Sequence, residues 1–97
     1  GAGENGADAT DSIGGKGGDG LENNFRTGSN VFYAGGGGGG EPQNSNGCQA
    51  VGGAGGGGAG WDNGVANTGG GGGGGRQAST NGQPGGTGIV VIRYIIS

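Results

Sequence analysis

The chain has 97 residues, of which 35 are glycine and 2 are proline, and its formal net charge is −3. This length allows one small domain, and the mild negative charge excludes the basic stripe that a duplex nucleic acid requires. No apolar run approaches the roughly 20 residues of a membrane-spanning helix. We therefore expect neither a nucleic-acid partner nor insertion into a membrane.

The first part of the chain, residues 1–24, mixes glycine with Asp, Asn, Glu and Ala. The short run over residues 31–33, Val-Phe-Tyr, then predicts a strand of three or four residues, because these side chains favour extended structure. Glycine tracts follow at 35–40, 52–58 and 69–75, separated by polar connectors. Their spacing of about 17 residues predicts parallel or antiparallel rods joined by loops.

Pure glycine tracts can form few regular structures. An α-helix is disfavoured, since each glycine costs about 1 kcal/mol relative to alanine, and collagen requires a proline-rich triplet repeat. The extended threefold helix has no internal hydrogen bonds, so neighbouring rods can satisfy one another's N–H and C=O groups. We therefore predict an irregular, all-β-like fold: a bundle or sandwich of polyglycine II helices with a C-terminal β-strand and essentially no α-helix.

The C-terminal strand is predicted over residues 89–96, a continuous apolar run rich in β-branched residues and carrying one charge. Both of its faces are apolar, so both need to be covered. An exposed strand of this kind would aggregate. The run must therefore pair within the domain or with other copies of the chain. The side chains expected in this core or oligomer contact are Ile89, Val91, Ile92, Tyr94 and Ile96.

Catalytic chemistry finds little support in the sequence. The chain has no histidine, which removes the Ser–His and Cys–His pairs of nucleophilic catalysis. Lys16 follows a glycine, but the flanking residues do not match a phosphate-binding loop. Cys48 is the single cysteine and cannot form an intrachain disulfide. We expect no enzyme activity, no catalytic residues and no cofactor.

One stretch fits a metal-binding pattern. Residues 14–22 match the calcium nonapeptide of β-roll proteins at every defined position, with Asp19 as the candidate ligand. That site requires stacked neighbouring turns, and the next nine residues do not repeat the pattern. Because one residue in three is glycine, chance explains the match well. We expect no metal and keep Asp19 as a weak calcium candidate.

The polar connectors carry the side chains best suited to recognition, because binding groups gather on loops at the ends of a rigid scaffold. Aromatic and amide side chains together suit sugars and protein surfaces. Alternatively, the aromatic residues plug the ends of rods that have no side chains of their own. The candidate ligand-binding or receptor-binding residues are Tyr33, Gln43, Asn44, Asn46, Trp61 and Asn63.

The end of the chain carries a specific pattern, Gly-Gly-Thr-Gly-Ile-Val-Val-Ile-Arg-Tyr at residues 85–94. Together with residues 31–34 before the first glycine tract, it resembles the glycine-rich domains of bacteriophage tail-fibre and related surface proteins. The resemblance implies that residues 1–97 are a single glycine-rich domain, the C-terminal part of a longer fibre protein. It also implies an extracellular place on the virion surface.

The same resemblance implies a function in host attachment. Adhesins of this composition pack polyglycine II rods into a sandwich and recognise a host receptor, a glycan or an outer-membrane protein, through loops at its end. Many fibre proteins are homotrimers, which would give residues 89–96 partners. A purely structural or capping segment without a ligand remains an alternative. Ice binding is another, since some ice-binding proteins also bundle threefold glycine helices, although Thr and Ala are scattered here.

Overall fold

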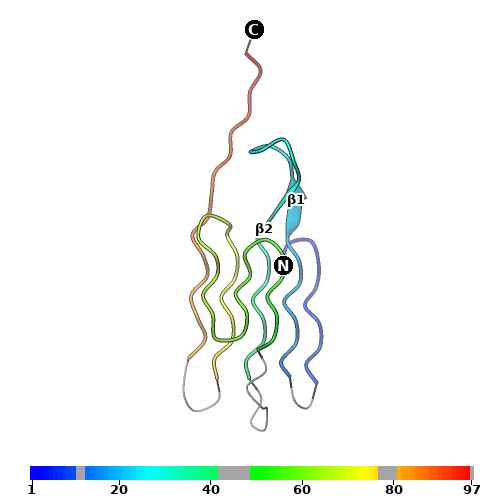
Figure 1. Cartoon of the computed structure of the whole chain (residues 1–97), viewed down its shortest axis with the longest axis vertical. Helices are drawn as coiled ribbons and strands as arrows, with labels where there is room; N and C mark the ends of the chain where they lie inside the picture. Colours follow the sequence, from blue (N-terminus) through cyan, green and yellow to red (C-terminus); the bar gives the residue numbers. More distant parts are fainter. Residues whose placement is uncertain (11–12, 42–48, 77–80, 97) are drawn as a thin grey trace.

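The structure is a computed structural model that describes residues 1–10, 13–41, 49–76 and 81–96. The chain runs repeatedly up and down one long axis and forms an elongated body with principal extents of 60 × 20 × 15 Å (Figure 1). Within the described ranges there is no helix, and the named strands are β1 (Leu21–Asn23) and β2 (Val31–Tyr33). The predicted absence of α-helix is confirmed for this part of the chain.

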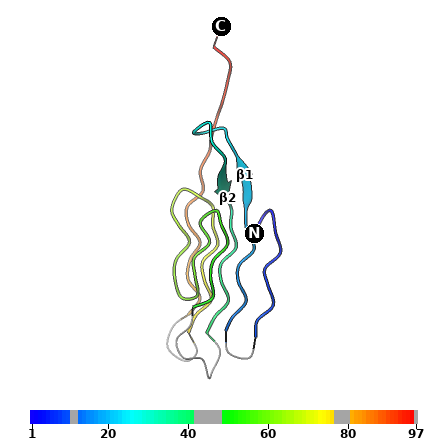
Figure 2. The same cartoon turned by 45° about the vertical axis from the view of Figure 1, so that its right-hand side comes forward.

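The strands β1 and β2 form an antiparallel hairpin that stands on one end of the bundle, which we call the hairpin end (Figure 2). Leu21 pairs with Tyr33, and Glu22 pairs with Phe32. The loop between them turns at Gly28, whose N–H donates to the carbonyl of Asn24 at 3.0 Å and whose φ is 80°. The strand predicted at 31–33 is confirmed. Its partner was not predicted, because a single leucine among polar residues is a weak strand signal.

Residues 34–41 lie in the middle of the bundle, and their hydrogen-bond partners repeat at every third position. On one side, the N–H groups of Gly36 and Gly39 donate to the carbonyls of Gly18 and Gly15, at 2.8 and 2.9 Å. These two bonds pair the segment antiparallel with residues 13–20. Backbone bonding of this kind satisfies polar groups that glycine tracts could not otherwise bury.

On two further sides of the same segment, the hydrogen bonds also recur at every third residue. The N–H groups of Gly35 and Gly38 donate to the carbonyls of Gly55 and Gly58, at 3.0 and 2.9 Å. Their carbonyls accept bonds, both of 2.9 Å, from N–H groups of residues 70–76. Residues 34–41 are therefore held by backbone bonds to three neighbouring segments rather than to the two neighbours of a flat sheet.

The direction of each segment follows from these bonds. Residues 34–41 and 70–76 run parallel. The N–H of Gly71 donates to Gly35 and that of Gly74 donates to Gly38, so donors and acceptors follow each other in the same direction. Residues 81–88 run antiparallel to 70–76, because Gln83 bonds to Gly73 and Gly86 bonds to Gly70. Residues 81–88 consequently run in the same direction as residues 13–20, toward the hairpin end (Figure 1).

The segments approach one another so closely that side chains are excluded between them. A Cβ atom added at Gly37 would meet the carbonyl oxygen of Gly72, and one added at Gly53 would meet that of Gly18, both well inside 3.0 Å. Among the described residues, Ala50 is the one apolar side chain that is buried. The core of this domain is therefore made of backbone, and glycine is the residue that permits it.

The boundaries of the rods differ from those expected. The tract at 52–58 is not one rod, because Gly55 and Gly56 adopt φ values of 99° and 87° and reverse the chain there. Extended segments also include sequence that is not pure glycine, such as residues 1–10 and 81–88. The tract spacing therefore does not mark equivalent units, since glycine serves both as rod and as turn.

The predicted C-terminal β-strand is wrong for this structure. Residues 89–96 extend away from the hairpin end and pair with none of the described segments (Figure 1). Their side chains are not core: among Ile89, Val91, Ile92, Tyr94 and Ile96, Val91 is half-buried and the others are exposed. The segment is extended, as β-branched residues favour, but it lacks the neighbouring strand that a ladder requires.

Candidate functional site: the two ends of the bundle

The end opposite the hairpin, which we call the loop end, carries a cluster around Arg76. The Nε of Arg76 donates to Oε2 of Glu41 at 2.6 Å, and the Glu41 side chain is only 9% exposed. The guanidinium also lies 4.7 Å from the centroid of the Trp61 ring, within the range of a cation–π contact. Glu41 and Arg76 end two parallel neighbouring segments, and a backbone bridge joins them.

A second set of polar contacts adjoins this cluster. Gln49 donates from Nε2 to the carbonyl of Gly60 at 2.7 Å and to Oδ2 of Asp62 at 3.1 Å. Between these acceptors, Trp61 adopts a φ of 51° in a tight turn, which the bond from Asp62 N–H to the Ala59 carbonyl closes at 2.9 Å. The turn holds the indole at the loop end in a half-buried position.

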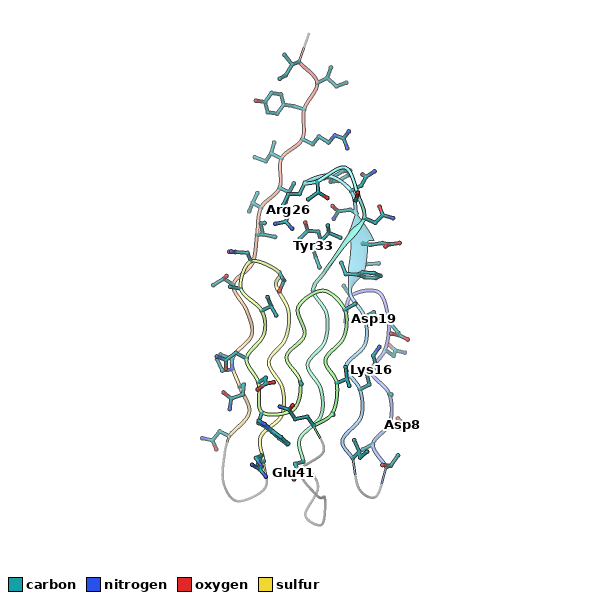
Figure 3. All side chains as sticks on the ribbon, viewed as in Figure 1. Asp8, Lys16, Asp19, Arg26, Tyr33 and Glu41 are labelled. Carbon is teal, nitrogen blue, oxygen red and sulfur yellow. The ribbon has the colours of Figure 1, made fainter. Side chains whose placement is uncertain are left out.

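The hairpin end presents a different arrangement (Figure 3). The guanidinium of Arg26 lies 6.0 Å from the centroid of the Tyr33 ring. The Tyr33 hydroxyl is buried and has no hydrogen-bond partner among the described residues. Leu21 and Phe25 on the hairpin are more than half exposed. This end therefore exposes apolar side chains among polar ones such as Glu22 and Asn24.

Along one side of the bundle, Asp19 connects separate segments (Figure 3). Its Oδ1 accepts bonds from Ala54 N–H at 2.8 Å and from Lys16 Nζ at 3.0 Å. The Ala54 bond, and then the Lys16 ammonium, hold the pKa of Asp19 below its usual value. The same Asp19 bond raises the pKa of Lys16. The carboxylate thus holds the segment that contains Asp19 to the one that contains Ala54.

The calcium candidate gains no support from this geometry. The Lys16 ammonium lies 3.0 Å from the Asp19 carboxylate, where a bound cation would have to compete with it. No group of three or more His, Cys, Asp or Glu side chains able to hold a metal occurs in the ranges that the structure covers. In the same ranges, no helix is long and apolar enough to cross a membrane.

The predicted binding residues fall into three groups. Trp61 lies at the loop end, beside Arg76, and Asn63 follows it by two residues. Tyr33 lies at the hairpin end, at the opposite end of residues 34–41 from Glu41 (Figure 3). An extended chain rises about 3.3 Å per residue, so that segment separates the two ends by roughly 20–25 Å and the two aromatic residues cannot share a site. Gln43, Asn44 and Asn46 lie outside the described residues.

Sequence reasoning missed Glu41, Arg76 and Gln49 as members of the loop-end cluster. A signal for two of them was available, because Glu41 follows the tract 35–40 directly and Arg76 follows the tract 69–75 directly. Opposite charges at equivalent ends of two tracts indicate neighbouring parallel rods. Gln49 carries no comparable signal in the sequence.

A bundle packed through its backbone, in a chain with 35 glycines among 97 residues, defines a domain of the glycine-rich class. The family described as "Glycine-rich domain" matches residues 1–95, and the chain belongs to that family. No curated protein and no solved structure matches the chain significantly. The glycine-rich part of the expected resemblance is thereby confirmed.

Proposed function

We propose that this glycine-rich domain is a non-enzymatic module of a phage tail fibre or similar surface fibre, which attaches to a host receptor through the loop end of its bundle. The observation that carries the proposal is the placement of Trp61, Arg76 and Glu41 together at that end. Tryptophan and arginine are among the residues enriched at contact surfaces.

In this proposal the extended segments are polyglycine II helices. The partners of residues 34–41 repeat at every third position, which is the repeat of a helix with three residues per turn. Neighbours on several sides also fit such a helix better than a flat strand. A bundle of this kind gives a stiff support for recognition groups at its ends.

The loop end is the better candidate for recognition because of where the chain ends lie. Gly1 and residues 89–96 are both found toward the hairpin end of the bundle (Figure 1). A preceding fibre segment would therefore join at the hairpin side, and the loop end would point away from the fibre. This orientation presents Trp61 and Asn63 to a cell surface outside the virion.

The receptor in this proposal is a host-surface glycan or an outer-membrane protein. The half-buried indole of Trp61 can stack on an apolar sugar face or a protein side chain. The exposed side chain of Asn63 can add hydrogen bonds to either. The proposal includes no cofactor, no nucleic acid and no membrane insertion.

Binding of the fluorescently labelled chain to a panel of bacterial strains tests this function. Trp61→Ala combined with Asn63→Ala should abolish attachment, while Phe25→Ala at the hairpin end, a matched loss of an aromatic ring, should leave it unchanged. Cells treated with periodate lose a glycan receptor, and cells treated with protease lose a protein receptor. Unchanged attachment by a correctly folded Trp61→Ala, Asn63→Ala chain would rule out the loop-end site.

A purely structural role is the second candidate, and one observation favours it. Arg76 already contacts both Trp61 and Glu41, as it would if the three residues only sealed the end of the bundle. In that case none of the bacterial strains binds the chain, and Trp61→Ala lowers only the stability of the domain. The ice-binding alternative requires thermal hysteresis in a freezing-point measurement, which neither of the other two functions produces.

Self-association belongs to the proposed function as well. Residues 89–96 are the segment through which copies would associate, because their exposed apolar side chains lie together at one end. A homotrimer is the stoichiometry that the resemblance to fibre proteins implies. The molar mass in solution distinguishes it from other assemblies.

A further inference from the structure

The C-terminal run is the largest exposed apolar feature of the described chain. Ile95 is 95% exposed and Val90 is 86% exposed, and Ile92, Tyr94 and Ile96 each exceed 70%. Isolated exposed apolar residues are ordinary, but a contiguous group of this size marks an interaction surface. Because the run is extended and rich in β-branched residues, its natural partner is the edge of a sheet.

The hairpin end of the bundle offers such an edge. The strand β1 pairs with β2 on one side, and on its other side it pairs with no described segment. A two-stranded hairpin is marginal by itself and gains stability from a third strand. Leu21 on this strand is 62% exposed, so an added strand would cover apolar surface there.

The charges select a register. Glu22 in β1 and Arg93 in the C-terminal run are both exposed, and neither has an ion-pair partner among the described residues. Placing them opposite each other in an antiparallel pair also places Leu21 opposite Tyr94. Opposite charges and apolar groups facing each other across two strands are the pairs that stabilise a sheet. Moving the register by two residues would set Glu22 against an apolar side chain.

The direction of the chain indicates that this partner is a second copy. Residues 81–88 run in the same direction as residues 13–20, which continue into β1, and 89–96 extend onward in that direction. Figure 3 shows the run leaving the bundle beside the hairpin rather than turning back. An antiparallel pair with β1 therefore requires a second molecule turned end for end.

We propose that residues 89–96 of one copy add as an antiparallel third strand to the free edge of β1 in a second copy, with Arg93 opposite Glu22. The exchange is reciprocal, because each copy carries both the run and the edge. A reciprocal exchange closes as a twofold dimer. The inference rests on the self-association part of the proposed function and predicts a dimer where the resemblance implies a homotrimer.

Charge reversal tests the register in the full chain. Analytical ultracentrifugation should give a dimer whose dissociation constant rises about tenfold or more in Arg93→Glu and in Glu22→Lys, since each change sets like charges opposite each other in both contacts. The double variant should return to within about threefold of the original value, because the swapped pair attracts again. Asp8→Lys, the same type of reversal away from the hairpin end, should leave the constant unchanged.

A crosslink tests the identity of the two strands. In a Cys48→Ser background, mixing Leu21→Cys chains with Tyr94→Cys chains under mild oxidation should form a disulfide that joins the two different chains. A chain that carries both substitutions should give a covalently closed dimer. A monomer with an internal disulfide would instead show that the run folds back within its own molecule.

Three results would overturn the inference. A trimer or a monomer at all concentrations contradicts the twofold exchange. A dimer that is insensitive to both charge reversals associates through some other surface. Pairing of the run with its own β2, which runs in the opposite direction but offers no acidic residue to Arg93, would set Leu21 and Tyr94 on strands about 9–10 Å apart, so neither disulfide would form. None of these results affects receptor binding at the loop end, so the two proposals can fail separately.

Discussion

The carboxylate of Asp19 accepts a hydrogen bond of 2.8 Å from the backbone N–H of Ala54, across 35 positions of sequence. The same oxygen accepts a bond from Lys16, and the N–H of Asp19 donates to a carboxylate oxygen of Glu4 at 3.0 Å. The Asp19 side chain thus adds a link between separate segments of a bundle that is joined mainly by its backbone.

Stability should depend on pH through Asp19. Its pKa in the folded state lies below the usual value of 3.8, because Ala54 N–H and Lys16 favour the charged form. The resulting stabilisation is fully present above that usual value and is lost as the pH falls toward the folded pKa. Asp19→Asn should lower the denaturation midpoint at pH 7 and flatten the loss of stability on acidification, as followed by circular dichroism. Asp8→Asn is the control and should change neither.

Adding a methyl group to a rod should be costly where rods touch. Gly37→Ala places a Cβ against the carbonyl oxygen of Gly72, and we expect a loss of about 1–3 kcal/mol or failure to fold, since overpacked sites relax poorly. Gly88→Ala meets nothing within 4 Å and should be neutral or slightly stabilising. Urea titration of both variants measures the difference. Equal stability would show that the backbones do not pack as closely as described.

The contact between Arg76 and Trp61 should be visible in fluorescence, because Trp61 is the only tryptophan. Arg76→Ala removes the guanidinium from the ring and the bond to Glu41, which should shift the indole emission to longer wavelength. We also expect a loss of stability of about 1–2 kcal/mol. Arg76→Lys keeps the charge but loses the planar group, so its spectrum should fall between the two. An unshifted spectrum in Arg76→Ala would contradict the contact.

The junction between β2 and the central segment should tolerate glycine better than alanine. Ala34 has a φ of 59°, a conformation that costs a residue with a Cβ but not glycine. Ala34→Gly should therefore stabilise the domain by about 0.5–1 kcal/mol in thermal or urea melts. Ala7→Gly, at an exposed position without this geometry, should be neutral or destabilising. If Ala34→Gly destabilised the domain, the methyl group of Ala34 would have to contribute more to stability than its backbone conformation costs.

Composition predicted the character of the core correctly. A chain with so many glycines and so few large apolar residues cannot build a side-chain core, so the absence of helix and the pairing of glycine segments through their amides could be expected before the fold was known. The strand at Val31–Tyr33 could likewise be predicted, because three β-favouring residues stand together. These predictions depend on local preferences, which the sequence contains.

The partner of each segment was decided only by the tertiary structure. Glycine has no side chain to distinguish one rod from another, so nothing in the tract 52–58 shows that Gly55 and Gly56 turn the chain. The separation of Tyr33 from Trp61, and the meeting of Arg76 with Trp61 and Glu41, depend on which segments lie side by side. For residues 89–96 the sequence predicted the extended conformation but not the pairing. A strand exists only where a neighbouring segment supplies its hydrogen bonds.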